Sequence, residues 1–218
     1  YKSYPVMYMH DGQNLFDNST SFAGEWGVDE TLDSLFSDGY DVPIVIGIDN
    51  GRELRIDELT PWPNSKYGGG DGDKYMRFIV ETLKPEIDKR YRTLPDAAHT
   101  SIMGSSLGGL ISFYGGLKYG SSINNIGVFS PSFWYSEKVY EFAQQIDTLP
   151  NTRIIILGSA LEDSTMVPDM QKMVELLKTK MDTNNLKMIV TKDGQHSEWY
   201  WKREFPKSVV WLLDLKKE

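Results

Sequence analysis

Length, composition and charge set the first limits on this protein. Its 218 residues suit one domain, so we expect residues 1–218 to form a single domain with its own core. The net charge of −8, from 23 Lys and Arg against 31 Asp and Glu, repels phosphate backbones and argues against a nucleic-acid partner. The absence of cysteine excludes disulfides, thiolate metal sites and a cysteine nucleophile, and no apolar run approaches the roughly 18–20 residues of a membrane span.

The chain opens on Tyr1 and Lys2 and runs straight into a strand-like segment, with no signal peptide in front of it. This start indicates a trimmed or mature chain. We therefore expect a secreted or periplasmic protein whose signal peptide, and any upstream module, lie outside this sequence. The composition leaves the oligomeric state open.

Short apolar runs alternate along the chain with segments of helical periodicity. Several runs are apolar throughout and rich in Val and Ile, as at Ile44–Ile46 and Ile154–Ile156, which is typical of strands in a sheet covered on both faces. The predicted strands are Pro5–His10, Val42–Asp49, Thr100–Met103, Asn125–Ser130, Arg153–Leu157 and Leu186–Lys192.

Between the strands, apolar residues recur at helical spacing and predict helices on both faces of a mostly parallel sheet, with ligands at the carboxyl ends of the strands. Pro85 interrupts the helical stretch Lys74–Lys89 and predicts a kink or two consecutive helices. One helix face carries Val28, Leu32, Leu35 and Phe36. A later stripe predicts core, because methionine commonly fills gaps there; it consists of Met170, Met173, Val174, Leu177 and Met181.

The segment Asn50–Asp73 has no clear periodicity and contains Pro61-Trp62-Pro63 and the glycine run Gly68–Gly70. A loop of this length is either a lid or pocket wall, or a surface excursion, and both readings stay open. The glycine run does not have the Lys and Ser or Thr that follow in a phosphate-binding loop.

The strongest catalytic motif is Gly104-Ser105-Ser106-Leu107-Gly108, which matches G-x-S-x-G. An apolar strand leads into it and a helix-compatible stretch, Leu107–Lys118, leads out, which is the setting of a nucleophilic serine in an α/β-hydrolase fold. Ser106 is then the nucleophile, and the small Gly104 and Gly108 permit the tight turn. The alternative is a glycine-rich packing turn with surface serines.

Three histidines compete for the role of general base. His99 precedes the strand that feeds the motif, so it belongs to the opposite end of the sheet, and His10 comes too early for the order serine, acid, histidine. His196 follows the last strand and fits both criteria, unless it is a loop histidine without a role. The acid should follow the strand Arg153–Leu157, where Glu162 and Asp163 are both candidates; we favour Glu162, with Asp163 as the carboxylate at a helix N-terminus.

Two backbone N–H groups are the expected oxyanion donors. One belongs to Leu107, directly after the nucleophile, and the other to Gln13, in the loop after the first strand. Gly12 supports the second assignment because it allows a close approach of the backbone. Water and these side chains suffice for the chemistry, so no metal or organic cofactor is expected.

The segment Tyr4–Phe16, with Met9-His10-Asp11-Gly12-Gln13 at its centre, resembles the opening of the putative-esterase family of feruloyl, acetyl xylan and enterobactin-type siderophore esterases. Further matches lie at Leu83–Asp88, Gly104–Gly109, Phe129–Trp134 and Gly194–His196. The resemblance implies an α/β-hydrolase fold, a triad of Ser106, His196 and Glu162 or Asp163, and an oxyanion hole at Gln13 and Leu107. The chain departs from the family in lacking its extra N-terminal strands and in the spacing of the acid loop.

The substrate expected from the resemblance is an acetyl or feruloyl ester borne by a small molecule or a plant polysaccharide, hydrolysed through an acyl-enzyme. Aromatic side chains in loops at the active end suit a sugar or phenolic ring, and Trp134, Trp62 and His10 are the predicted substrate contacts. A siderophore trilactone is the alternative substrate, although an acidic chain argues against a trianionic ligand. An inactive hydrolase fold that serves as a binding module is the alternative from another class. The other aromatic candidates are Trp26, Tyr67, Tyr135 and Trp199.

Overall fold

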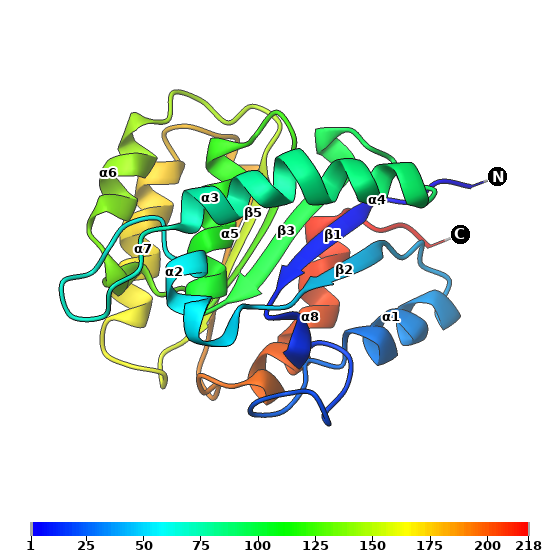
Figure 1. The fold of residues 1–218 in the computed structure, drawn as a ribbon, viewed down its shortest axis with the longest axis horizontal. Coiled ribbons are helices and arrows are strands. Elements are labelled where there is room, and N and C mark those ends of the chain that lie inside the picture. Colours follow the sequence, from blue (N-terminus) through cyan, green and yellow to red (C-terminus); the bar gives the residue numbers. More distant parts are fainter. Residues whose placement is uncertain (1, 218) are drawn as a thin grey trace.

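A computed structural model describes residues 2–217 and contains one six-stranded sheet, in which all neighbouring strands are parallel (Figure 1). The strand order is β2-β1-β3-β4-β5-β6. All six predicted strands are confirmed, with ends that differ by one or two residues. The strands are β1 (Val6–His10), β2 (Ile44–Ile48), β3 (Thr100–Ser105), β4 (Asn125–Phe129), β5 (Arg153–Ser159) and β6 (Leu186–Thr191).

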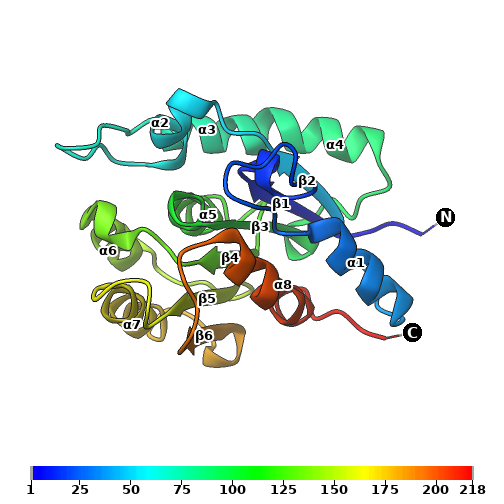
Figure 2. The same ribbon diagram turned by 90° about the horizontal axis from the view of Figure 1, so that it is seen from below.

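Helices connect the strands and cover both faces of the sheet (Figure 2). They are α1 (Val28–Ser37), α2 (Arg55–Leu59), α3 (Gly72–Phe78), α4 (Lys84–Arg90), α5 (Leu107–Lys118), α6 (Lys138–Gln145), α7 (Met166–Leu177) and α8 (Glu198–Leu212). Short 3-10 turns lie at Gly12–Asn14, Arg52–Leu54, Ala97–His99, Phe133–Tyr135 and Thr183–Asn185. No helix within residues 2–217 is both long and apolar enough to cross a membrane.

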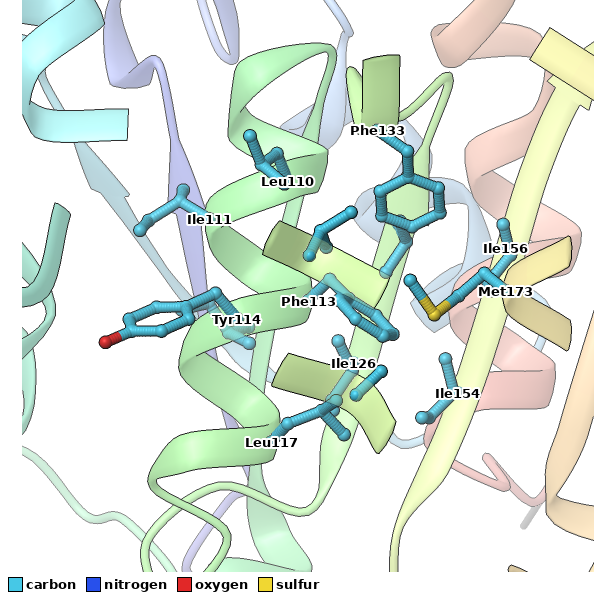
Figure 3. Close-up of a cluster of buried hydrophobic side chains, with 14 of the residues drawn as sticks. Leu110, Ile111, Phe113, Tyr114, Leu117, Ile126, Phe133, Ile154, Ile156 and Met173 are labelled. Carbon is cyan, nitrogen blue, oxygen red and sulfur yellow. The ribbon is translucent and has the colours of Figure 1, made fainter. Parts of the chain in front are cut away.

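Alternate residues of each strand enter two separate cores. On β1, Val6 and Tyr8 belong to the core that also contains residues of α3, α5, α6 and α7, whereas Met7 and Met9 belong to the core that contains residues of α1 and α8. Helix α5 lies at the centre of the first core, where the rings of Phe113 and Phe133 meet edge to face at 5.2 Å (Figure 3). The methionine stripe lies in the same core, as predicted.

The structure confirms one of three local predictions and differs from the other two. Pro85 stands in the first turn of α4, and a π-helical turn (Ile79–Leu83) joins α3 to α4, so the predicted interruption is present. Phe36 is 67% exposed because it points off the buried stripe of α1 that Val28 and Leu35 form. The segment Asn50–Asp73 contains the short helix α2, which its sequence did not predict, because five residues are too few to show a period.

Candidate active site

Ser106 occupies the sharp turn between β3 and α5. Its φ of 58° and ψ of −122° are a conformation that side chains other than glycine seldom adopt. Strain of this kind costs about 1–3 kcal/mol and needs support from the surrounding structure. The support comes from β4 and the turn behind it: Ser106 N–H donates to the carbonyl of Phe129 at 2.9 Å, and Ser132 N–H donates to the carbonyl of Ser106 at 3.1 Å.

The turn is tight because the strand and the helix approach each other at two glycines. A Cβ on Gly104 would lie 2.8 Å from the carbonyl group of Gly108, a distance that no side chain tolerates. The first residues of α5 are therefore held directly against the end of β3. As the first residue of α5, Leu107 has a backbone N–H that the helix itself leaves without an acceptor. Such an N–H, at the positive end of a helix dipole, can stabilise an oxyanion next to Ser106.

The second expected oxyanion donor, Gln13, lies in the 3-10 turn that follows β1. Its side-chain amide binds the backbone of Asn50 in both directions, with Nε2 donating to the Asn50 carbonyl at 2.9 Å and Oε1 accepting from the Asn50 N–H at 3.1 Å. A Cβ on Gly12 would lie 2.9 Å from the backbone of Gly47, so the turn packs directly on β2. The close approach expected at Gly12 is thus made to the neighbouring strand.

His196, on the wall of the cavity that contains Ser106, forms a carboxylate–imidazole pair with the buried Glu162 behind it. Nδ1 of His196 donates to Oε2 of Glu162 at 2.7 Å. The Glu162 side chain is only 1% exposed, whereas that of His196 is 42% exposed. A buried carboxylate on Nδ1 orients the ring and leaves Nε2 to exchange protons with a substrate or a serine hydroxyl. Catalytic hydrogen bonds of this kind often tighten only in the complex with substrate.

A buried chain of hydrogen bonds holds Glu162 from behind. The indole N–H of Trp201 donates to Ser130 Oγ at 2.8 Å, and the Ser130 hydroxyl donates to Glu162 Oε1 at 2.9 Å. The backbone N–H of Ser159 donates to the same oxygen at 2.7 Å. Ser130 has a φ of 42° directly after β4, so it is a second strained residue next to the nucleophile strand. Trp201 also meets the His196 ring edge to face at 5.2 Å.

Asp163 points elsewhere, although it is adjacent to Glu162. Its Oδ1 accepts the backbone N–H groups of Thr165 at 2.7 Å and Met166 at 2.8 Å, at the N-terminus of α7. Burial would raise the pKa of Asp163, but these hydrogen bonds lower it below its ordinary value. The structure therefore brings Glu162, and not Asp163, to the His196 ring.

His10 is fully enclosed at the carboxyl end of β1. Its Nδ1 lies 2.8 Å from the hydroxyl of Tyr75, and its Nε2 is buried with no hydrogen-bond partner among residues 2–217. Burial lowers the pKa of His10 to about 4, with Arg55 acting in the same direction and Asp11 against it. A neutral, buried ring of this kind is a wall of the site and a poor proton acceptor near neutral pH.

Asp11, with a φ of 55°, is the third strained residue at this end of the sheet. The guanidinium of Arg55 donates a hydrogen bond to each carboxylate oxygen of Asp11, at 2.7 and 2.8 Å. The side-chain amide of Asn50 donates a third, at 2.6 Å. Burial opposes the charge on Asp11, but Arg55 and Asn50 keep the pKa of its carboxyl below the ordinary value. This ion pair anchors α2 to the turn that presents Gln13.

One cavity of about 840 Å³ joins these groups, a volume suited to a small organic substrate. Ser106 and His196 both line it, together with His10 and the backbone turn of Gln13. The first part of the segment Asn50–Asp73 forms one wall, so the pocket-wall interpretation of that segment is correct for these residues. In that segment the lining residues are Asn50, Arg52, Glu53 and Arg55. Elsewhere they include Asp11, Asn14, Phe22, Trp26, Glu198 and Trp201.

Two of the predicted substrate contacts lie outside this cavity. Trp62 packs against Tyr114 and Phe142, on a separate shallow groove over α5 and α6, so its expected role finds no support in its position. Trp134 is 50% exposed beyond the cavity and meets Tyr67 edge to face.

Several residues of the site escaped the sequence analysis, notably Ser130, Trp201, Arg55 and Glu198. Ser130, Trp201 and Arg55 reach the site through contacts between distant segments, which a local pattern does not reveal. Glu198 reaches it because it follows His196 by two residues. The position of Ser130 directly after β4 was the one available signal, because side chains at the carboxyl ends of adjacent parallel strands meet. No cluster of three or more His, Asp or Glu residues within 2–217 is arranged to hold a metal ion.

Comparison with known proteins places this chain in a family. The family model described as "Putative esterase" matches residues 1–212. The "Uncharacterized protein YbbA" of Bacillus subtilis (strain 168) is 28% identical over 225 residues, which cover 96% of this chain and 85% of that protein. An enterobactin esterase from Shigella flexneri, solved with 2,3-di-hydroxy-N-benzoyl-glycine, superposes with a TM-score of 0.74 at 15% identity, over 97% of this chain and 53% of that one.

A feruloyl esterase module from Clostridium thermocellum, solved with sinapinate, superposes with a TM-score of 0.71 at 14% identity. The superposition covers 100% of this chain and 80% of the module. This chain spans about half the length of the Shigella enzyme and most of the clostridial module. At these identities the two structures show the fold, and they confirm the expected α/β-hydrolase architecture.

Proposed function

Because this chain belongs to the Putative esterase family and is a serine esterase, we propose that Ser106, His196 and Glu162 are its catalytic triad. One observation carries the proposal. The strained Ser106 faces the same cavity as a histidine whose Nδ1 is held by a buried carboxylate. Such strain persists where it presents a nucleophile, and this pairing is what activates a serine hydroxyl.

The reaction would proceed in two steps. His196 Nε2 takes the proton of the Ser106 hydroxyl as Oγ attacks the ester carbonyl, and the N–H groups of Gln13 and Leu107 stabilise the oxyanion that forms. His196 then gives the proton to the oxygen of the departing alcohol, which leaves an ester on Ser106. Water, deprotonated by His196, attacks that ester, releases the acid and restores Ser106. Glu162 remains ionised and stabilises the imidazolium in both steps.

In the free enzyme, Ser106 Oγ lies 3.3 Å from Ser132 Oγ. This contact orients the Ser106 hydroxyl and leaves Nε2 of His196 available for another hydrogen bond. We expect it to be exchanged for His196 Nε2 when the carbonyl of a substrate enters.

For the substrate we propose acetyl or feruloyl esters of plant polysaccharide. The feruloyl esterase module solved with sinapinate supports an aromatic acyl group. The aromatic side chains of Phe22, Trp26 and Trp201 on the cavity wall suit a phenolic or sugar ring.

A siderophore ester is the second candidate, favoured by Arg52 on the cavity wall, which forms no ion pair with any described residue. The net charge of the chain argued against an anionic ligand, and a cationic side chain on the cavity wall weakens that argument. Arg55 contributes less, because Asp11 already neutralises it.

The test combines covalent labelling with a substrate panel. A serine-directed organophosphonate should label one residue, Ser106, and mass spectrometry locates the adduct. An adduct on Ser105, or esterase activity that persists without an adduct, would contradict the assignment. Rates on acetylated xylan, feruloylated arabinoxylan fragments and a catecholate trilactone, each with Ser106→Ala as the control, then separate the two substrate classes.

A further inference from the structure

Glu198 is a buried carboxylate in the cavity that the proposed triad leaves without a role. It is the first residue of α8, is 8% exposed and lines the cavity together with Ser106 and His196. Asn14 Nδ2 donates to its Oε1 at 3.2 Å, and no described residue forms an ion pair with it. Burial raises the pKa of Glu198, and Asp11 adds to this, while His196 and Arg55 act in the opposite direction. A carboxylate is kept in such a place at a cost in solvation.

The position of Glu198 relates it to one half of the substrate. In the first step, His196 must deliver a proton to the oxygen of the leaving alcohol, so that alcohol lies beside the imidazole. Glu198 follows His196 by two residues and lines the same cavity. The alcohol, and not the acyl group, is therefore the part of an ester that Glu198 can contact.

The charges in the cavity decide what kind of alcohol this is. A cationic alcohol at Glu198 would stand beside the imidazolium that forms on His196 and would oppose its formation. A neutral hydroxyl group has no such effect and donates a charge-assisted hydrogen bond to the carboxylate. The Arg55 guanidinium donates two hydrogen bonds to Asp11 and none to Glu198. Glu198 can therefore accept a hydrogen bond from a ligand.

The second face of this subsite is apolar. Asn14 holds it in place, because the same side chain that donates to Glu198 accepts the backbone N–H of Phe22 at 3.1 Å. Phe22 is 96% exposed and also lines the cavity. The cavity thus offers a carboxylate and an exposed aromatic ring, both tied to Asn14, which match a sugar with hydroxyl groups at its edge and C–H groups on its face.

We infer that Glu198, positioned by Asn14, is the residue that binds the hydroxyl groups of a sugar alcohol during ester cleavage. The inference rests on the proposed function and adds to it a subsite for the alcohol. Glu198 is a specificity residue in this scheme: it transfers no proton and distinguishes a sugar ester from a simple alkyl ester of the same acid.

The test compares two esters that share an acid and differ in the alcohol. Methyl ferulate and ferulate esterified to arabinose form one pair; methyl acetate and acetylated xylose form the other. The quantity measured is the ratio of kcat/KM for the sugar ester to kcat/KM for the methyl ester. We expect Glu198→Gln to lower this ratio by about tenfold, because a neutral amide oxygen replaces the charged acceptor and binds a hydroxyl group more weakly. Glu204→Gln, on the same helix but not lining the cavity, makes the matched change of charge and should keep the ratio.

The outcomes separate the inference from the function on which it rests. If the protein hydrolyses neither pair, or if Ser106→Ala retains the rate, the proposed function fails. If hydrolysis depends on Ser106 and Glu198→Gln leaves the ratio unchanged, the alcohol subsite is wrong. Should Glu198→Gln not fold, Glu198→Asp keeps the buried charge and withdraws the carboxylate by one methylene. Its ratio should also fall, and an unchanged ratio overturns the inference.

Discussion

The two ends of the sheet each carry a histidine bound to a carboxylate, and the surroundings of the two pairs differ. At the amino end, His99 Nδ1 lies 2.8 Å from Asp96, three residues earlier, with side-chain exposures of 47% and 56%. At the carboxyl end, His196 binds a Glu162 that is 1% exposed and lies after β5, 34 residues earlier in the chain. A pair open to water contributes little, whereas a buried carboxylate can direct a proton.

The backbone differs between the two ends in the same way. Before β3, Asp96 caps its own 3-10 turn by accepting the N–H of His99, so the turn is stabilised by its neighbours in sequence. After β1, β3 and β4, the residues Asp11, Ser106 and Ser130 all have positive φ. Each is held by a distant segment: Asp11 by Arg55, Ser106 by Phe129 and Ser130 by Leu157. Function is concentrated where local preference is overruled by long-range contacts.

The largest expected effect separates the two histidine pairs. His196→Ala should lower kcat by at least about a thousandfold, because Ser106 loses its base and only binding and oxyanion stabilisation remain. His99→Ala, at the opposite end of the sheet, should stay within about twofold of the native rate. Steady-state kinetics on one ester measures both. A comparable loss in the two variants would mean that burial of the carboxylate does not distinguish them.

The next effect concerns the two adjacent carboxylates. Glu162→Gln should lower kcat by roughly a thousandfold, because the amide keeps the shape but does not stabilise an imidazolium and favours the wrong tautomer. Asp163→Asn should lower the melting temperature instead, because Asp163 accepts two backbone N–H groups at the start of α7.

Kinetics and thermal unfolding of both variants test this division of roles. If Asp163→Asn has the larger effect on kcat, the acid is Asp163 and the hydrogen bond seen at Glu162 is not the one used in catalysis.

How far the sequence predicts this molecule depends on the range of the contacts involved. The strands were predictable because runs such as Ile154–Ile156 are apolar on both faces. That Ser106 and His196 line one cavity was predictable because chain order and sheet end place them together. The choice between Glu162 and Asp163 stayed open, since adjacent residues share every pattern. Only their side-chain directions separate them, and those follow from Ser130 and from the turn into α7.

The failures have the same origin. Helix α2 is held by the pair of Arg55 with Asp11, 44 residues apart, and carries no periodicity of its own. Trp201 reaches Ser130 across 71 residues. Trp62 was predicted at the cavity because aromatic residues in loops suit ligands. Its ring instead packs against the rings of Tyr114 and Phe142.

A smaller effect is expected behind Glu162. Ser130→Ala removes the hydroxyl that donates to Oε1, and Trp201→Phe removes the indole N–H that holds that hydroxyl. Each should lower kcat by about 10- to 100-fold, because the acid is misplaced. For Ser130→Ala the KM should change little, because Ser130 does not line the cavity, whereas Trp201 does. Since both act through one network, the double variant should be no worse than about the larger single effect. Fully multiplicative losses would contradict a shared path through Ser130.

The smallest effect is one of stability, and it isolates His10. Its folded pKa of about 4 lies below the ordinary value of 6.5, chiefly because of burial. Between these two values the unfolded chain binds more protons than the folded one, so stability contributed by the neutral ring is complete above pH 6.5 and is lost as the pH falls toward 4. Between pH 7 and 4.5 this amounts to about 2 kcal/mol.

The test is urea unfolding of the native protein and of His10→Gln at both pH values. The free energy of unfolding should fall between pH 7 and 4.5 by about 2 kcal/mol less in His10→Gln than in the native protein. Equal pH dependence in His10→Gln and the native protein would mean that His10 is charged or hydrated in the folded state, and that the wall of the cavity at β1 is wet.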